Sequence, residues 1–225
     1  MLAFGAADTH GHLLTVGDRA AAGDLAHAVQ VALHAVLPSP SRFLPAEITP
    51  VVDHFHLVNA FRYVQRNAAH HGVQDPLATE ASSVHDLLGL RYIAPWLAPR
   101  VRAALPRTHR EELTDLLGLP TLALVAEPSS TTLPLAAAAI IGQSKLQGEG
   151  RLVVNARVAA VALVKQRWRS IEIARALEVG LRTVQDYATR EADPNLVDSL
   201  NRQLAWMTAV VKVADPLLSP NRRTR

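Results

Sequence analysis

The stretch Phe61-Arg62-Tyr63-Val64-Gln65-Arg66-Asn67 decides how the N-terminal part of this 225-residue chain is interpreted. It lies in a segment with helical spacing of apolar residues that begins after Asp53, a residue type that caps helix N-termini, and ends near His71. In one continuous helix, residues four apart lie on the same side. The segment therefore predicts a helix that presents the Tyr63 phenol and the Asn67 amide together.

Two histidines precede this helix by about fifty residues, in the sequence His10-Gly11-His12. On a strand, residues two apart point to the same face, so these two imidazoles could bind one metal ion. A second pair, His54 and His56, lies inside the predicted helix, where residues two apart point about 200° apart. Alone, such pairs are more typical of packing or surface positions. Their combination with Tyr63 and Asn67 predicts metal-assisted cleavage of a phosphodiester.

The remaining pattern predicts a mixed chain with three regions. Residues 2–4 and 10–16 have strand-like patterns, and residues 24–37 have the apolar spacing of an amphipathic helix. Between residues 79 and 134 the pattern breaks into short helical pieces at 84–88, 98–105 and 110–117, which are separated by prolines. We therefore predict domains at residues 1–90 and 149–225, joined by a helical connecting region at 91–148.

Composition limits the class of protein. The chain has no cysteine, which excludes disulfides and thiolate metal sites and makes a cytoplasmic location the default expectation. The longest apolar stretch, Thr132 to Ile141, is far shorter than the ~20 residues that a membrane-spanning helix needs. We therefore expect no membrane partner.

Charge is distributed unevenly along the chain. Residues 1–150 carry 10 Lys and Arg against 13 Asp and Glu, a balance of −3. Residues 151–225 carry 13 against 7, a balance of +6. A solvated helical surface would explain this excess, and so would a polyanionic partner, because basic side chains that contact phosphates release condensed counterions.

The segment from Ser170 to Tyr187 has the spacing of a helix-turn-helix. Apolar residues in both halves predict a shared core, and the second half would be the recognition helix that enters the major groove of duplex DNA. Glu178 lies in the turn, where Gly is usual. The alternative is a helical hairpin with no role in nucleic-acid binding. The candidate DNA-binding residues are Leu181, Arg182, Thr183, Gln185 and Asp186.

These motifs together resemble a known family. The order of a His-x-His strand, an amphipathic helix, a Phe- and Pro-containing loop and a helix with aromatic-x-Tyr-hydrophobic-x-Arg-Asn resembles the REP-associated tyrosine transposases. These are relatives of the single-tyrosine HUH transposases of small bacterial insertion sequences. Residues 1–90 carry the resemblance, and Ser82-Ser83 resembles a Ser pair that follows the nucleophile helix. Some members also have a C-terminal helix-turn-helix.

The resemblance implies a fold and a chemistry. It implies an α+β fold in which an antiparallel sheet is flanked by helices, followed by an all-α C-terminal region. His10, His12 and Asn67 would bind Mg²⁺ or Mn²⁺, and Tyr63 would attack phosphorus to form a 5′-phosphotyrosine. The implied partners are single-stranded or hairpin DNA at the N-terminal domain and duplex DNA at the helix-turn-helix. A homodimer, with an active site within one chain or between two, is compatible with these motifs.

The chain departs from the family pattern at three places. Gly11 replaces a hydrophobic residue between the histidines, and Asn67-Ala68 replaces Asn-Pro. Family members also have a substantial segment before the metal-binding strand, so we expect further strand-forming sequence upstream of Met1, the chain being N-terminally truncated relative to the family. Gly11 and the short segment before His10 favour an alternative function, that of a catalytically inactive, transposase-derived DNA-binding protein or regulator, whereas the presence of His10, His12, Tyr63 and Asn67 favours the transposase.

Overall fold

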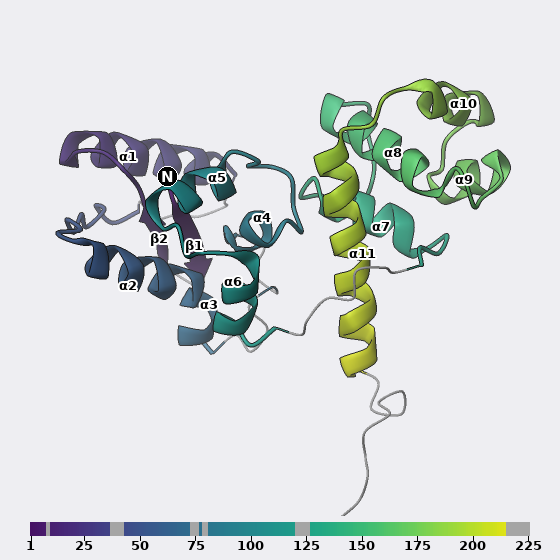
Figure 1. The fold of residues 1–225 in the computed structure, drawn as a ribbon. Coiled ribbons are helices and arrows are strands. Elements are labelled where there is room, and N and C mark those ends of the chain that lie inside the picture. Colours follow the sequence, from purple (N-terminus) through teal and green to yellow (C-terminus); the bar gives the residue numbers. More distant parts are fainter. Residues whose placement is uncertain (8–9, 37–42, 73–76, 78–80, 120–126, 215–225) are drawn as a thin grey trace, which may run out of the picture. The chain divides into compact units, whose positions relative to one another are not determined.

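The computed structural model describes residues 1–7, 10–36, 43–72, 77, 81–119 and 127–214. The described chain is mostly helical and contains one small antiparallel sheet of two strands, which confirms the α+β prediction in its coarse form (Figure 1). Its residues form two compact units. The N-terminal unit comprises Met1–Val84 and Pro99–His109, and the C-terminal unit comprises His85–Ala98 and Arg110–Arg225.

The sheet of the N-terminal unit is a hairpin of β1 (Ala3–Ala7) and β2 (His10–Leu14). In its register Gly5 pairs with His12 and Ala7 with His10, so both histidines lie on one face of the hairpin, as predicted. On its other edge β1 forms an antiparallel bridge from Gly5 to Ser82. The hairpin is thus joined to a segment about 75 residues further along the chain.

Three helices belong wholly to the N-terminal unit: α1 (Arg19–Val36), α2 (His54–Gln65) and α3 (Asn67–His70). The N-terminus of α2 is capped by Asp53, whose Oδ1 accepts a hydrogen bond from the His56 N–H at 2.7 Å. The predicted continuous helix to His71 is interrupted at Arg66, which has φ −94° and ψ 8°. Tyr63 and Asn67 therefore lie on two successive helices rather than on one.

Both α2 and α3 pack against β1, and this contact requires a glycine on the strand. A Cβ atom added at Gly5 would lie 3.0 Å from the Val64 carbonyl oxygen and 3.6 Å from the Asn67 Cβ. Because the first of these neighbours is backbone, it has little freedom to move away. The missing side chain of Gly5 lets the helices that carry Tyr63 and Asn67 approach the strand opposite His12.

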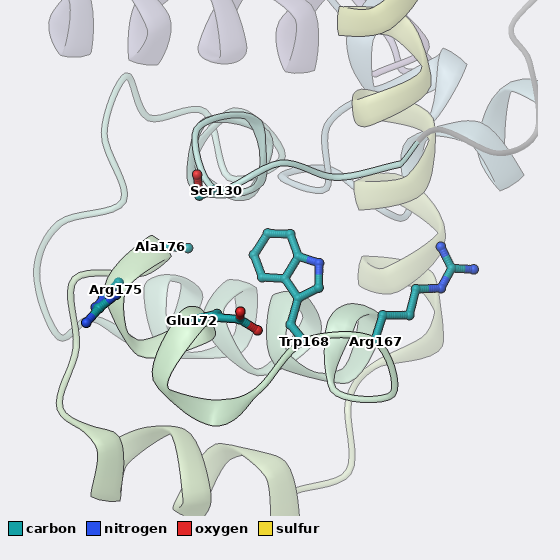
Figure 2. Close-up of a pocket in the computed structure, with 6 residues that line it drawn as sticks. All are labelled: Ser130, Arg167, Trp168, Glu172, Arg175 and Ala176. Atoms are coloured by element: carbon teal, nitrogen blue, oxygen red, sulfur yellow. The ribbon is translucent and has the colours of Figure 1, made fainter.

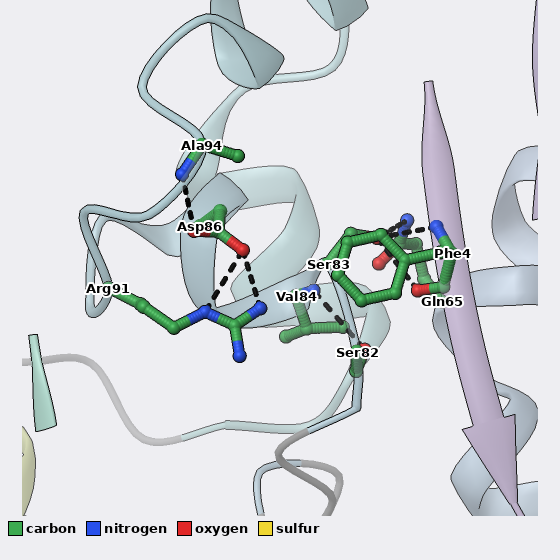
Figure 3. A network of polar contacts seen from close by, with 8 residues as sticks. All are labelled: Phe4, Gln65, Ser82, Ser83, Val84, Asp86, Arg91 and Ala94. Carbon is green, nitrogen blue, oxygen red and sulfur yellow. Dashed lines mark hydrogen bonds and ion pairs between the residues drawn. The ribbon is translucent and has the colours of Figure 1, made fainter. Parts of the chain in front are cut away.

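Hydrogen bonds connect residues 81–83 to β1 (Figure 3). The Ser83 Oγ accepts a hydrogen bond from the Phe4 N–H and donates one to the Phe4 carbonyl, each at 3.0 Å. It also accepts a hydrogen bond from the Gln65 Nε2 at 3.2 Å. Ser83 therefore ties β1 to the end of α2.

The C-terminal unit is built around five helices: α7 (Thr132–Ala139), α8 (Arg151–Val164), α9 (Ser170–Ala176), α10 (Leu181–Thr189) and α11 (Pro194–Ala214). Small alanines of α7 and α8 are fully buried and allow close helix packing. Around them lie large side chains that are almost fully buried, each contributing about 1.5–3 kcal/mol of burial free energy. These are Leu133, Ile140, Val161, Ile173, Leu196, Leu200 and Leu204.

The short helical pieces predicted between residues 79 and 134 and the predicted connecting region at 91–148 are divided between these units. Two elements match closely, since α4 (Val84–Leu88) has the predicted bounds and α6 (Arg110–Leu116) ends one residue earlier. Helix α5 (Leu97–Ala104) also lies where a helix was predicted. In the structure, however, α7 packs on α8 and α11 and so belongs to the C-terminal core.

Polar contacts order residues 85–98 internally and attach this segment to α11 of the C-terminal unit. The buried Asp86 carboxylate accepts hydrogen bonds from the Arg91 guanidinium and from the Ala94 N–H (Figure 3). The Tyr92 hydroxyl donates a hydrogen bond to the Asp193 Oδ2 at 2.9 Å, next to the start of α11. Burial and this hydrogen bond raise the pKa of the Tyr92 phenol.

Among the described helices, none has the length and apolar character needed to cross a membrane.

Candidate functional site

Five aromatic rings gather where the hairpin meets the ends of α2 and α3. The His10 and His12 ring centroids are 5.1 Å apart, and the His10 and His71 centroids are 4.5 Å apart. Tyr63 lies 5.1 Å from His12 and 5.1 Å from His70. We call these five residues the ring cluster. The structure therefore brings together three of the four residues that the sequence predicted for catalysis, His10, His12 and Tyr63.

His12 is the more buried of the two histidines that are predicted to bind the metal ion. Its Nε2 is buried and has no hydrogen-bond partner among the described residues. Burial, together with the nearby His10 and His71 imidazoles, lowers the pKa of His12. A lowered pKa keeps the imidazole neutral, which is the form that binds metal ions.

Asn67, the fourth predicted residue, is only 1% exposed. Neither its amide oxygen nor its amide nitrogen has a hydrogen-bond partner within the described parts of the chain. An unpaired buried amide costs about 1–3 kcal/mol, so such a group calls for an explanation such as a bound ion or water. Its Cβ lies beside Gly5, the residue paired with His12, so Asn67 and His12 approach the same part of β1.

The tyrosine of the ring cluster is accessible. Tyr63 is 44% exposed although its ring contacts two histidines. The His12 ring meets it nearly edge-on, at an interplanar angle of 80°, whereas the His70 ring stacks on it at 27°. The phenol is therefore held from two sides while a large part of it stays open to solvent.

The predicted ligands at this site supply donor types that divalent cations bind. Two imidazoles and one amide oxygen are ligand types that bind divalent ions such as Mn²⁺, with Mg²⁺ favouring the oxygen donor. Within the described residues, no group of three or more His, Cys, Asp or Glu side chains is arranged to hold a metal ion. Of the predicted ligands, only His10 and His12 belong to those residue types. The third ligand would be the Asn67 amide, which has no hydrogen-bond partner among the described residues.

Sequence reasoning missed His70 and His71. Both follow Asn67 closely, His70 as the last residue of α3 and His71 as its C-cap, in the segment that the sequence predicted to continue the helix of Tyr63. The two adjacent histidines, so close to Tyr63 and Asn67, were the sequence signal that could have marked them as candidate site residues. Their contacts with Tyr63 and His10 could not be anticipated because they join side chains of α2, α3 and the hairpin, which are brought together by the packing of both helices against β1.

The predicted DNA-binding residues lie on α10. Leu181, Arg182, Gln185 and Asp186 are exposed and Thr183 is partly exposed, whereas Val184 and Tyr187 on the other side are buried in the core. Helices α9 and α10 begin at Ser170 and Leu181, where the sequence placed the start of the motif and of its second helix, and they contact each other and, through α10, α8. The helix pair thus presents one polar face that is free of the core.

The turn between α9 and α10 has a strained residue. Glu178 has φ +53°, the left-handed region that favours glycine. This is the position at which the sequence has Glu where such turns usually have Gly. The left-handed conformation reverses the chain after Leu177, and both Ile173 and Val184 are then buried in the same core.

A pocket of about 710 Å³ lies beside α9 in the C-terminal unit. Figure 2 shows that the side chains of Arg167 and Arg175 extend away from the Trp168 ring. The pocket therefore does not concentrate positive charge on a common ligand position. Its lining residues are Ser130, Arg167, Trp168, Glu172, Arg175 and Ala176.

The second His-x-His pair takes no part in the ring cluster. His54 is exposed in the first turn of α2, and the His56 Nδ1 accepts a weak hydrogen bond from the Val52 N–H at 3.4 Å. Their separation from the ring cluster agrees with the choice of His10 and His12 as the candidate ligands.

No protein-family model, curated protein or solved structure matches this chain.

Proposed function

We propose that this chain is a divalent-metal-dependent DNA transposase that cleaves and rejoins single-stranded or hairpin DNA through Tyr63. The observation that supports this most directly is the contact of the Tyr63 ring with His12, at 5.1 Å between centroids. It places an accessible phenol next to a candidate metal ligand. Residues more than fifty positions apart in the sequence supply the two groups.

In the proposed reaction the Tyr63 Oη attacks phosphorus and the bond from phosphorus to the 3′ oxygen breaks. The phenol proton is lost to solvent, and the leaving oxygen gains a proton to become a free 3′-OH. His10, His12 and the Asn67 amide oxygen would hold Mg²⁺ or Mn²⁺. When bound, this ion would supply charge stabilisation at the phosphoryl oxygens. Because the phosphotyrosine link conserves bond energy, a 3′-OH can later displace Tyr63 and rejoin the strand.

The test is formation of a covalent adduct. The full chain is incubated with Mn²⁺ or Mg²⁺ and a pool of hairpin and single-stranded oligonucleotides, and denaturing gels with mass spectrometry detect a Tyr63 peptide bearing a 5′-phosphate. Tyr63→Phe abolishes the adduct while metal binding persists, because only the hydroxyl is removed. His10→Ala and His12→Ala also abolish it, and Asn67→Ala reduces it.

The matched control is His54→Ala, which removes an exposed imidazole outside the ring cluster and leaves adduct formation unchanged. An adduct that survives Tyr63→Phe would overturn the choice of nucleophile. Absence of any adduct from the wild-type chain, with both metals and the whole oligonucleotide pool, would favour the second candidate function.

The second candidate is a DNA-binding protein that acts through α9 and α10. The exposed polar face of α10 and the +6 charge balance of residues 151–225 favour it. If Arg182 and Gln185 contact base edges, Arg182→Ala and Gln185→Ala each weaken binding of a selected duplex by about 1–3 kcal/mol. Titration of the duplex at increasing salt tests this candidate, since phosphate contacts make binding salt-dependent. Affinity that does not change with salt for any duplex contradicts it.

A further inference from the structure

Neither the residues predicted for catalysis nor the resemblance assigns a role to His70, yet its ring stacks on the candidate nucleophile. The His70 and Tyr63 centroids are 5.1 Å apart and their planes differ by 27°. Both side chains are exposed, so burial in a core does not account for their contact. We propose that His70 is a positioning residue that fixes the plane of the Tyr63 phenol for attack on phosphorus. This inference rests on the proposed function.

An exposed tyrosine side chain can adopt several rotamers. Tyr63 is 44% exposed, so core packing does not select its rotamer and the rings that contact it must do so. An in-line attack requires the Oη to lie about 3–3.5 Å from phosphorus in an aligned geometry. Any group that restricts the phenol to one orientation therefore increases the fraction of molecules that are ready to react.

The two histidines that contact Tyr63 restrict different motions. The edge contact from His12 limits how far the ring swings toward the hairpin, and the face contact from His70 limits its rotation about the bond to the Cβ. Stacked and edge-on aromatic pairs are both favourable arrangements. One contact comes from β2 and the other from α3, so together they clamp the phenol from independent elements.

The interruption at Arg66 is consistent with this role. His70 follows Tyr63 by seven residues, which in a straight helix would separate their Cα atoms by about 10 Å along the axis. The break between α2 and α3 allows the two rings to stack all the same. His71, the next residue, contacts His10, so one short helix end reaches both the nucleophile and a candidate metal ligand.

The kinetic test separates attack from binding. Single-turnover adduct formation is measured across DNA concentrations for the wild type, His70→Ala, His70→Phe and His70→Gln. Loss of an aromatic contact predicts that His70→Ala slows the rate at saturating DNA by about 2- to 12-fold, with little change in half-saturation. His70→Phe keeps a stacking ring and restores the rate to near the wild-type value, whereas His70→Gln does not.

Two kinetic outcomes overturn the proposal. A wild-type rate for His70→Ala means that the stacked ring has no effect on attack. Rescue by Gln without rescue by Phe means that His70 acts by proton transfer or hydrogen bonding rather than by stacking. Because His70 is exposed, these variants are expected to fold, and circular dichroism together with an unchanged DNA half-saturation verifies this.

A second measurement needs no activity. The chain has three tyrosines, so uniform labelling with 3-fluorotyrosine gives three ¹⁹F signals, and Tyr63→Phe identifies the signal of Tyr63. This signal shifts in His70→Ala and stays in place in the matched control His54→Ala. No shift in His70→Ala overturns the inference even if the adduct forms. A shift without any wild-type adduct refutes the proposed function while leaving the ring contact established.

Discussion

Replacing Gly5 tests whether close approach to β1 assembles the site. In Gly5→Ala the new Cβ would lie 3.0 Å from the Val64 carbonyl oxygen, a distance that forces the strand or α2 to shift. Overpacking of this kind typically costs about 1–3 kcal/mol. Alanine recovers about 0.5–1 kcal/mol of the conformational cost of glycine in a strand. We therefore expect a net loss of about 0.5–2 kcal/mol in the stability of the N-terminal unit.

Gly11→Ala is the matched control on the neighbouring strand. Its new Cβ would meet the Ala6 Cβ at 3.6 Å, an ordinary van der Waals contact. The gain in strand propensity is then not offset, and stability rises by about 0.5–1 kcal/mol. The two substitutions make the same chemical change on paired strands but are expected to have opposite signs.

Peptide-resolved hydrogen exchange of residues 1–14 measures this difference, because it reports the opening free energy of the hairpin separately from the C-terminal unit. The Leu2 N–H, which donates to the Leu14 carbonyl at 2.7 Å, is one of the amides to follow. Protection in Gly5→Ala that equals or exceeds that in Gly11→Ala would refute the argument that α2 needs a glycine on β1.

Three further predictions concern single side chains. Glu178→Gly relieves the left-handed strain at φ +53° and raises the unfolding free energy in urea by about 0.5–1 kcal/mol, whereas Glu178→Ala gives no gain. Arg91→Ala leaves the buried Asp86 carboxylate without its ion pair and lowers the unfolding free energy measured in urea by about 3–5 kcal/mol. A loss below about 1 kcal/mol contradicts this prediction. The lowered pKa of His12 means that the unfolded chain binds its proton more readily, so without metal the hairpin loses protection as pH falls below 6.5. His12→Asn removes that part of the pH dependence, and an unchanged pH profile of hydrogen exchange would count against this cause.

The sequence by itself determined the elements that depend on neighbouring residues. The cap at Asp53 and the bounds of α4 at Val84–Leu88 follow from local patterns and were predicted closely. So were the two helices at Ser170–Ala176 and Leu181–Thr189, because their apolar spacing selects one buried face each. The alternation of side chains on a strand also placed His10 and His12 on a common face.

Only the tertiary structure decided which groups meet in the candidate site. The contacts of His70 with Tyr63 and of His71 with His10 form where α2 and α3 pack against β1, and the helical pattern of residues 53–71 signals neither this packing nor the interruption at Arg66. The bridge from Gly5 to Ser82 joins residues more than seventy positions apart. Such contacts depend on the packing of separate elements, where the absence of one side chain sets how close a helix can come. Local periodicity carries no information about that distance.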